Sequence, residues 1–211
     1  MATTNRAAAM AALAAEAAGC TRCPLSTTGT PVVWGEGDPE AAVMLIGQGP
    51  GEQEVKQGRP FIGPAGELLN RALARVGIDR RRLWITNALK HWATSVNPRG
   101  TRVNRAPYAS ELRACAVWWQ GELAIVRPRL IVCAGGPAVQ AVIDKRLKIG
   151  EVRGQWLSGP GGVPAMATVH PSYLLRLRGA DPAVFDRAWS DFLGDLQAVV
   201  ARAQALGIAL R

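Results

Sequence analysis

Cys20 and Cys23 stand two residues apart in the segment CTRC, a spacing at which two thiolates can bind one metal centre. In a cytosolic chain this spacing indicates a metal or iron–sulfur site rather than a disulfide. A complete site needs four ligands, and the other candidates are two further cysteines and two histidines. Spacing alone selects Cys115 and Cys133, but Cys133 lies in LIVCAGG, where a small buried residue of a central strand is the better interpretation. We therefore choose His91 as the remaining ligand, with an ordinary surface histidine as the alternative.

The stretch IGQGPGEQE places three glycines and a proline within a few positions, directly after an apolar run. One interpretation is a nucleotide loop whose backbone N–H groups bind phosphate. However, the stretch lacks the Lys-Ser/Thr ending of a P-loop, and Glu52 and Glu54 would repel a phosphate. A second interpretation is a pocket floor for a flat polar ring, with the acids or Gln48 handling a water molecule. A tight turn without further function is the third.

Two later segments contain further residues that could do chemistry. Phe61 lies in GRPFIGPAG, where an aromatic ring between Gly and Pro could stack on a base; a core anchor is the alternative. His170 begins HPSYLLR, with an apolar wedge behind it of the kind that fills the gap left by a flipped base. The plainer interpretation of this segment is a helix start with Ser172 as its cap.

The elements that must position these residues alternate between strands and helices. We predict strands at Ala41–Ile46, Leu83–Thr86, Leu130–Ala134 and Ala165–Val169. We predict helices at Ala65–Val76, Ala109–Val126, Pro137–Lys145 and Pro182–Leu206. This alternation predicts an α/β fold with a parallel sheet covered on both faces, and ligands bind such sheets outside the carboxyl ends of the strands. The loops expected to meet at that edge begin at Gly47, Asn87, Gly135 and His170.

Length and composition narrow the class of protein. The chain has 211 residues, 48% of them hydrophobic, which suits a single domain over residues 1–211. No apolar stretch reaches the ~18 residues of a membrane span. Residues 1–16 are Ala-rich and include Glu16, so we predict a helical extension rather than a signal peptide, and a bacterial cytoplasmic protein that works at the nucleoid. The net charge of +9 favours an acidic polymer as partner. Residues 93–108 form the one long polar loop in this prediction.

Five motifs occur in the order C-x2-C, GQGPGEQE, GRPFIGPAG, ITNALKHW and HPSYLLR. Together they closely resemble the iron–sulfur uracil-DNA glycosylases of the family-four type and their relatives of the X type, over residues 17–200. The resemblance implies a three-layer α/β/α fold with a central, mainly parallel four-stranded sheet. It also implies an enzyme that flips deoxyuridine out of DNA and hydrolyses the bond from base to sugar, leaving an abasic site for base excision repair.

The same resemblance assigns roles to individual residues. Phe61 stacks on uracil, and Asn87 pairs its amide with uracil O4 and N3–H. His170 stabilises negative charge on uracil O2 as the glycosidic bond breaks. Glu54 lies near uracil C5, where a side chain obstructs the methyl group of thymine. The other residues expected at uracil are Gly47, Gln48 and Gly49. The residues expected at DNA are Arg102, Asn104, Arg105, Ser172, Leu174, Leu175 and Arg176.

Three positions depart from the family pattern. His91 followed by an aromatic residue matches the X type, whereas family-four members carry a cysteine there. The resemblance then gives the ligands of a 4Fe–4S cluster as Cys20, Cys23, His91 and Cys115. Asn104 stands where X-type proteins carry a histidine that bonds covalently to the deoxyribose, and a carboxamide is too poor a nucleophile to form that trap. Gln48 replaces a glutamate of the relatives and cannot act as a general base, which leaves Glu52 as the nearest carboxylate for polarising the water.

We therefore predict a monofunctional uracil-DNA glycosylase that binds uracil-containing DNA as a monomer, with no membrane partner. The principal alternative is an X-type protein that binds uracil-containing or abasic DNA with little turnover, since Gln48 weakens the activation of water. A third possibility is an iron–sulfur nucleotide-binding or redox protein. It is disfavoured because no phosphate loop is complete and the histidine with its apolar wedge would have no role.

Overall fold

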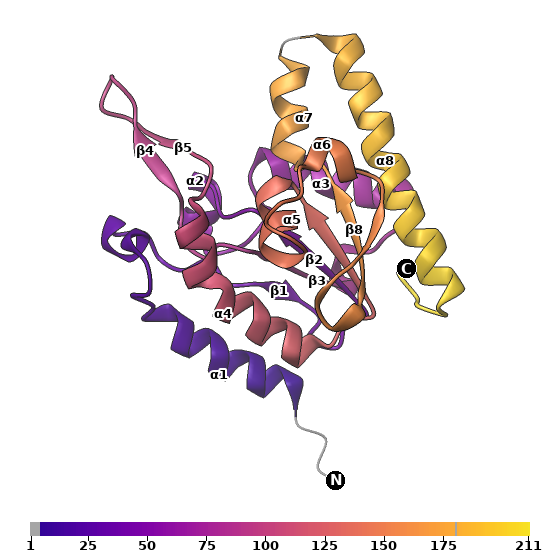
Figure 1. Ribbon diagram of the computed structural model, residues 1–211, viewed down its shortest axis with the longest axis horizontal. Helices are drawn as coiled ribbons and strands as arrows, with labels where there is room; N and C mark the ends of the chain where they lie inside the picture. The colour runs from indigo at the N-terminus through magenta and orange to yellow at the C-terminus, as the bar shows by residue number, and fades with distance from the viewer. Residues whose placement is uncertain (1–4, 180) are drawn as a thin grey trace.

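A six-stranded sheet with the order β1-β3-β2-β6-β8-β7 runs through the centre of the computed structural model (Figure 1). The structure describes residues 5–179 and 181–211. The strands of this sheet are β1 (Glu36–Gly37), β2 (Val43–Gly47), β3 (Leu83–Asn87), β6 (Leu130–Ala134), β7 (Trp156–Ser158) and β8 (Pro164–Thr168). The α-helices are α1 (Arg6–Ala18), α2 (Glu52–Gln57), α3 (Pro64–Val76), α4 (Ala109–Val126), α5 (Gly136–Val142), α6 (Ile149–Val152), α7 (Pro171–Arg178) and α8 (Pro182–Ala205). Short 3-10 helices lie at η1 (Pro24–Thr28), η2 (Arg80–Arg82) and η3 (Pro160–Gly162).

The inner strands β3, β2, β6 and β8 are parallel to one another, and β1 and β7 pair antiparallel at the two edges. The predicted α/β fold with a mainly parallel core of four strands is thereby confirmed. The edge strands were not predicted, because two or three residues are too few to show a periodic pattern.

Helices cover both faces of the sheet. One layer contains α1, α4, α5 and α6, and the other contains α3, α7 and α8 (Figure 1). Along β2, Met44 and Ile46 face the first layer, whereas Val43 and Leu45 face the second. Because both faces are buried, successive residues of an inner strand are all apolar although their side chains alternate between faces. The four predicted helices are present as α3, α4, α5 and α8.

The segment predicted as a long polar loop is a β-hairpin, so the prediction is wrong for these residues. Its strands β4 (Thr94–Val96) and β5 (Arg102–Asn104) pair antiparallel. The side chain of Asn97 accepts hydrogen bonds from the backbone N–H groups of Arg99 and Thr101 and closes the turn. The hairpin projects from the body of the protein, and the α7–α8 pair forms a second projection across from it (Figure 1).

Helix α1 packs along α4 through the buried side chains of Met10 and Ala17. Asn5 caps it, because its side chain accepts from the backbone N–H groups at the helix start. Residues 1–4 of the predicted helical extension lie outside the described residues. Within residues 5–179 and 181–211, no helix combines the length and apolar character needed to cross a membrane.

Candidate active site

The four loops predicted to meet at the carboxyl edge of the sheet do so. Gly47 and Asn87 end β2 and β3 and lie opposite each other in the parallel register. His170 follows β8 and directly precedes α7. A Cβ added at Gly135, after β6, would lie 2.9 Å from the Cβ of His170, so these two loops are in contact. Residues far apart in the chain therefore share one site.

Gly47 forms the floor of this site. A Cβ at this position would overlap both the ring of Phe61 and Oδ1 of Asn87. Only a residue without a side chain lets the end of β2 lie against both groups. The backbone carbonyls of Gly47 and Gln48 join this loop to the segment after β3, because they accept hydrogen bonds from the N–H groups of Ala88 and Leu89.

Asn87 offers an unpaired carboxamide in the interior. The residue is 1% exposed, and neither Oδ1 nor Nδ2 has a hydrogen-bond partner among the described residues. Leaving a buried donor and acceptor unpaired costs about 1–3 kcal/mol per group. Buried polar groups are rarely left in this state, so the carboxamide is available to a ligand with one acceptor and one donor side by side.

Phe61 lies against His170, with ring centroids 5.5 Å apart and ring planes inclined by 30°. The ring is buried, and its backbone has a φ of 53°, which is unusual for a bulky residue. The carboxylate of Glu54 accepts hydrogen bonds from the backbone N–H groups of both Gly51 and Phe61. Burial raises the pKa of Glu54, and these two hydrogen bonds oppose that shift. The N–H of Gly51 is thus already bound to a carboxylate, which disfavours the phosphate-loop interpretation.

His170 caps α7, the role that the sequence suggested for Ser172. Its Nδ1 accepts from the backbone N–H of Ser172 at 3.1 Å and lies 2.8 Å from the hydroxyl of the same residue. Burial lowers the pKa of His170 to about 4, and the positive charge of Arg176 contributes to the shift. The ring is therefore neutral at pH 7. Because Nδ1 accepts the Ser172 N–H, the ring proton lies on Nε2, which becomes a donor.

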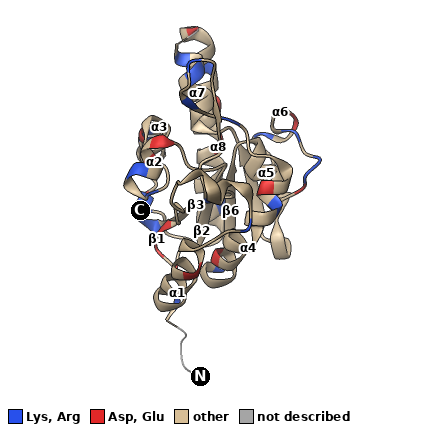
Figure 2. Ribbon diagram, turned by 90° about the vertical axis from the view of Figure 1, so that its left-hand side faces the viewer, with Lys and Arg blue, Asp and Glu red and all other residues tan. Residues whose placement is uncertain are grey.

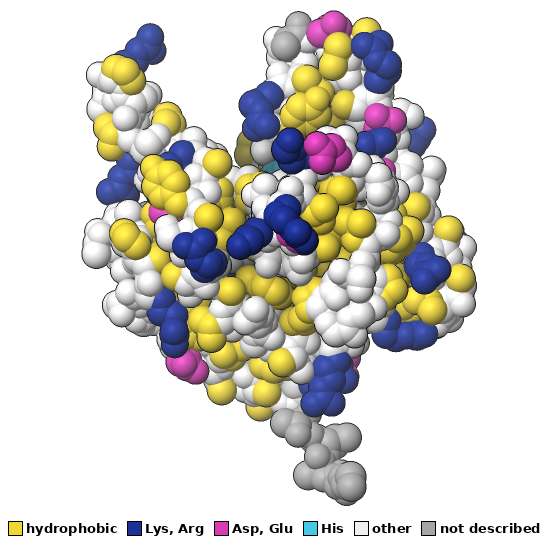
Figure 3. Space-filling model, in the orientation of Figure 1, with side chains coloured by type: hydrophobic (Ala, Val, Ile, Leu, Met, Phe, Trp, Pro, Cys, Tyr) yellow, Lys and Arg dark blue, Asp and Glu magenta, His cyan; other side chains and the backbone are white. Residues whose placement is uncertain are grey.

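A groove of about 1180 Å³ leads to this edge. It runs between the hairpin and α7, and in Figure 3 the two projections flank a notch with Lys and Arg side chains on both sides. Gln48, Gly49 and Glu52 line the groove on the β2 side. Gln48 is half-buried, whereas Glu52 is exposed and pairs with Lys56 at 2.7 Å. The two residues expected to handle a water molecule thus lie in one groove, although Glu52 already has a cationic partner.

Three residues of the hairpin region were predicted to contact DNA, and two of them line the groove. Asn104 and Arg105 line the groove, whereas Arg102 is exposed farther out on β5. Asn104 Oδ1 accepts from the indole Nε1 of Trp92. Arg105 is held by Glu111, with the guanidinium 2.5 Å from its carboxylate. These two side chains are therefore fixed in place.

The α7 side of the groove differs from the prediction at one residue. Ser172, Leu175 and Arg176 line the groove, but Leu174 is 0% exposed and packs in the core. Adjacent positions on a helix point in directions about 100° apart, which lets Leu175 line the groove while Leu174 is turned into the core. The expectation that Leu174 contacts DNA is corrected accordingly. Figure 2 shows that α7 also carries much of the positive charge on this projection.

The predicted metal ligands come from three separate segments. Cys23 and Cys115 are buried, Cys20 is half-buried, and His91 is 5% exposed, which excludes an ordinary surface histidine. Burial raises the pKa of Cys115 to about 11, against the opposing charge and backbone hydrogen bond of Lys90, and Cys23 and Cys20 add to the rise. Cys133 is fully buried in β6, and its interpretation as a core residue is confirmed.

Two sulfurs accept hydrogen bonds from the protein. The indole Nε1 of Trp118 donates to Cys20 Sγ at 3.1 Å, and Lys90 N donates to Cys115 Sγ at 3.2 Å. Such bonds are typical of iron–sulfur ligands. In the part of the chain that the structure describes, no three His, Cys, Asp or Glu side chains converge closely enough for a single metal ion. Three cysteines and a histidine, with two of the sulfurs accepting protein N–H groups, are a donor set that fits an iron–sulfur cluster.

A buried ion pair behind the site was missed in the sequence. Lys90 Nζ lies 2.7 Å from Glu122 Oε2, and both side chains are 0% exposed. Thr86 donates to the other carboxylate oxygen at 3.0 Å, and the ring of Trp34 covers the ammonium at 4.9 Å. A lysine after a strand and a glutamate on a helix both resemble surface residues, so only the fold reveals their pairing.

The geometry is that of an α/β protein with a groove and an unpaired, buried carboxamide at the carboxyl edge of its sheet. Comparison with known families gives the class: residues 34–193 match the uracil DNA glycosylase superfamily, and the chain belongs to this family. The match includes the glycine-rich stretch, Phe61, Asn87 and His170, and leaves out Cys20 and Cys23.

Relatives named type-4 uracil-DNA glycosylases are similar to most of the chain. The protein of Thermotoga maritima is 39% identical over 160 residues, which cover 75% of this chain and 79% of the relative. That of Pyrobaculum aerophilum is 35% identical over 170 residues, covering 76% and 83%. A type-5 uracil-DNA glycosylase from the same organism is 30% identical over 192 residues, covering 74% and 79%.

Proposed function

We propose that this chain is a monofunctional uracil-DNA glycosylase of the type-4 kind, which flips deoxyuridine out of DNA and releases uracil in base excision repair. It is a hydrolase of the N-glycosyl bond, and its partner is uracil-containing DNA. Membership of the superfamily and the similarity to type-4 relatives support this function. The single observation that carries it is the buried, unpaired carboxamide of Asn87 beside the ring of Phe61.

Asn87 selects uracil by the polarity of its edge. Uracil presents the acceptor O4 next to the donor N3–H, so Nδ2 of Asn87 donates to O4 while Oδ1 accepts from N3–H. Cytosine presents a donor amine and an acceptor N3 at these places, and both contacts would then be mismatched. A site built to hydrogen-bond one edge rejects the other strongly, because the buried carboxamide would be left unpaired. Phe61 stacks on the face of the ring.

Discrimination against thymine falls to the wall near C5. Glu54 forms this wall, and its side chain obstructs the thymine methyl group. Since the carboxylate of Glu54 is bound to two backbone N–H groups, the wall is stiff. A fixed side chain excludes an added methyl group better than a mobile one.

His170 stabilises the leaving group. As the bond from C1′ to N1 breaks, its electron pair moves into the uracil ring and negative charge gathers on O2. The Nε2–H of a neutral His170 donates to that oxygen. A donor held in advance at the site of developing charge lowers the barrier without reorganisation.

Water completes the reaction by bonding to C1′ and losing a proton to solvent. Gln48 orients this water through its amide oxygen, and Glu52 polarises it. A strong base is not required if bond breaking runs ahead of water attack, since an oxocarbenium-like sugar accepts weakly activated water. Gln48 therefore suffices where a glutamate would be expected.

DNA lies along the groove between the hairpin and α7. Arg176, Ser172 and Arg102 contact phosphates, and Leu175 fills the gap left by the flipped base. Asn104 and Arg105 form the opposite border of the groove. The positive charges on both sides favour a polyanion, and we expect a monomer that acts in the bacterial cytoplasm, at the nucleoid.

Cys20, Cys23, His91 and Cys115 would hold a 4Fe–4S cluster. Such a cluster would serve as a structural centre that joins the segment after α1, the loop after β3, and α4. The N–H groups of Trp118 and Lys90 that donate to two of the sulfurs support this assignment.

Product leaves without a covalent trap. Asn104 stands where a histidine would bond to the deoxyribose, and its oxygen is bound to Trp92. We expect wild-type protein to give no SDS-resistant complex, whereas Asn104→His gives a partial one. A product profile unchanged by Asn104→His would contradict this placement of the hairpin.

The test of the proposed function uses an end-labelled oligonucleotide with one uracil, treated with alkali and run on a denaturing gel. We expect scission at the uracil by the wild-type protein, and none in matched oligonucleotides with thymine or cytosine. Asn87→Ala serves as the matched control for the site. Binding in a gel-shift assay without scission would refute the enzyme and favour the binding protein of the X type.

A further inference from the structure

The backbone of Phe61 adopts a conformation that a bulky residue avoids. Its φ of 53° lies in the left-handed region, and among the described residues Arg127 is the only other non-glycine with positive φ. Such conformations persist only where the surroundings enforce them, and they occur preferentially at functional sites. Some part of the protein must therefore hold Phe61 in this state.

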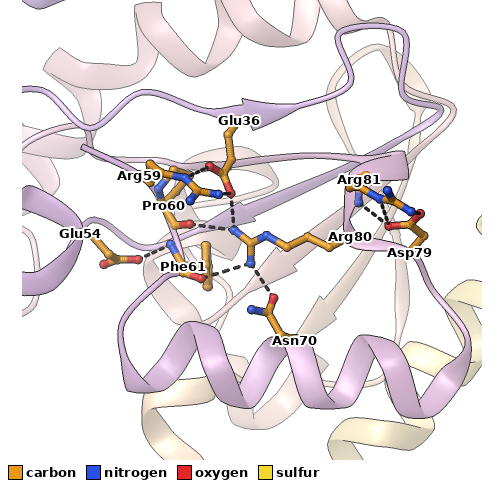
Figure 4. A network of polar contacts seen from close by, with 9 residues as sticks. All are labelled: Glu36, Glu54, Arg59, Pro60, Phe61, Asn70, Asp79, Arg80 and Arg81. Atoms are coloured by element: carbon orange, nitrogen blue, oxygen red, sulfur yellow. Dashed lines mark hydrogen bonds and ion pairs between the residues drawn. The ribbon is translucent and has the colours of Figure 1, made fainter. Parts of the chain in front are cut away.

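Two charged side chains hold the backbone of Phe61 from opposite sides (Figure 4). On one side, the carboxylate of Glu54 accepts from the N–H of Phe61. On the other side, Arg80 Nη1 donates to Phe61 O at 3.1 Å, and its Nη2 donates to Pro60 O at 2.8 Å. Helix α3 closes the third side, because a Cβ at Gly66 would overlap Phe61 O.

Arg80 is itself fixed by two other segments. Its Nη2 donates to Glu36 Oε1 at 2.7 Å, and its Nη1 donates to Asn70 Oδ1 at 2.8 Å (Figure 4). Burial by itself would raise the pKa of Glu36, but hydrogen bonds from Arg59 and Arg80 outweigh it and hold the pKa below the usual value. Glu36 therefore stays charged at neutral pH. Each terminal nitrogen of the guanidinium makes two hydrogen bonds, a geometry that a lysine ammonium cannot reproduce.

Arg80 does not line the groove. It borders a separate depression on the protein, together with Arg59, Arg81 and Asp79. Of the groups that Arg80 contacts, Phe61 is the one that lies beside Asn87 in the site, so the backbone of Phe61 is the direct route by which Arg80 can influence the base.

We propose that Arg80, fixed by Glu36 and Asn70, is a positioning residue that holds Phe61 in its left-handed conformation and so presents the ring to the flipped uracil. This inference rests on the proposed function, because it assigns the stacking of uracil to Phe61. Without Arg80, the Phe61 peptide relaxes toward an ordinary conformation, and the ring leaves the face of the base.

The first test compares Arg80→Gln and Arg80→Lys with Arg81→Ala as the matched control. Arg81 is the next residue, and among the described residues its side chain pairs only with Asp79. We expect kcat/KM for uracil release to fall about tenfold in both Arg80 variants, within the about 5- to 150-fold range for losing one base–aromatic stack. Arg81→Ala should stay within about twofold of the wild type. Wild-type kinetics in both Arg80 variants would overturn the proposal, and Arg80→Lys alone decides the outcome if Arg80→Gln does not fold.

The second test separates stacking from general damage by using DNA that cannot be cleaved. Affinity is measured for a duplex containing 2′-fluoro-2′-deoxyuridine and for the same duplex with a tetrahydrofuran abasic analogue. The Arg80 variants should lose affinity only for the duplex with the base, and an equal loss for both would overturn the proposal. This readout does not depend on turnover, so a wild-type protein that binds but does not cleave refutes the proposed function and leaves this test intact.

The third test is a double-mutant cycle with Phe61→Ala. If Arg80 acts through Phe61, adding Arg80→Gln to Phe61→Ala should lower kcat/KM by less than about twofold further. A full tenfold loss in the Phe61→Ala background would show that Arg80 acts by another route.

Discussion

His170 should remain neutral across the physiological pH range, and its neutral ring should supply the donor for uracil O2. Burial and the nearby charge of Arg176 lower its pKa from an ordinary 6.5 to about 4. At pH 6 an ordinary histidine is about three quarters protonated, whereas one with this pKa is only about 1% protonated. Protonation at Nδ1 would place two donors face to face, because Ser172 N–H already points at that nitrogen. We therefore expect kcat/KM to show no step with a midpoint near pH 6.5.

The assay combines single-turnover rates with NMR titration of the imidazole rings. The chain has only two histidines, so His170→Ala assigns the signals of His170 by their absence. Between pH 5.5 and 8, His170 should not titrate. Titration of its ring near pH 6.5, together with a parallel change in rate, would refute the argument.

The lowered pKa of His170 also makes the free energy of unfolding depend on pH. Between its folded pKa of about 4 and the unfolded value of 6.5, the unfolded chain binds more protons at His170. The free energy of unfolding should therefore fall as pH falls through this window, and the contribution is complete only above about pH 6.5.

His170→Asn separates catalysis from helix capping. Asparagine retains an acceptor for the Ser172 N–H, so the cap, worth about 1 kcal/mol, is kept. It lacks a donor at the position of Nε2, so the rate of uracil release should fall about 10²- to 10³-fold at nearly unchanged melting temperature. His170→Ala should lose both the helix cap and the donor to uracil O2, so that both the melting temperature and the rate fall. A fully active His170→Asn would show that the histidine is only a helix cap.

Three other predictions follow from the site and its supports. Asn87→Ala should lower kcat/KM about 5- to 150-fold through loss of two hydrogen bonds, without weakening the affinity for abasic DNA; equal weakening of both would contradict the base-reading role. Lys90→Met should lower the free energy of unfolding by about 3–5 kcal/mol in urea, because it strands the buried carboxylate of Glu122, and Lys90→Met/Glu122→Gln should recover most of the loss. An additive loss in that double variant would contradict the pairing. Protein prepared without oxygen should show broad absorbance at about 400 nm, and the double variant His91→Ala/Cys115→Ala should lose this absorbance. A colourless preparation that contains zinc would contradict the cluster.

Much of the fold follows from the sequence because its signals are local. Each inner strand is a short apolar run that ends at a Gly, Asn or His, and the intervening helices carry regular apolar spacing. The β4–β5 hairpin was not predicted, because its strands are short, polar and exposed. Their pairing depends on contacts across the hairpin rather than on burial.

For the candidate site too, some features follow from the sequence and others only from the tertiary structure. The sequence by itself determined which residues stand at the ends of the parallel strands, and so brought Gly47, Asn87 and His170 to one edge. Only the tertiary structure decided that Leu174 faces the core while Leu175 faces the groove, since their spacing does not say which side of α7 is buried.

The hydrogen bonds that hold the backbone of Phe61 show most clearly what cannot be predicted from the sequence. Its motif marks an aromatic residue in a constrained loop, but no local pattern connects it to an arginine on η2 and a glutamate on β1. Hydrogen bonds between segments distant in the chain leave no periodic trace in the sequence, because their geometry exists only after the sheet and its helices have assembled.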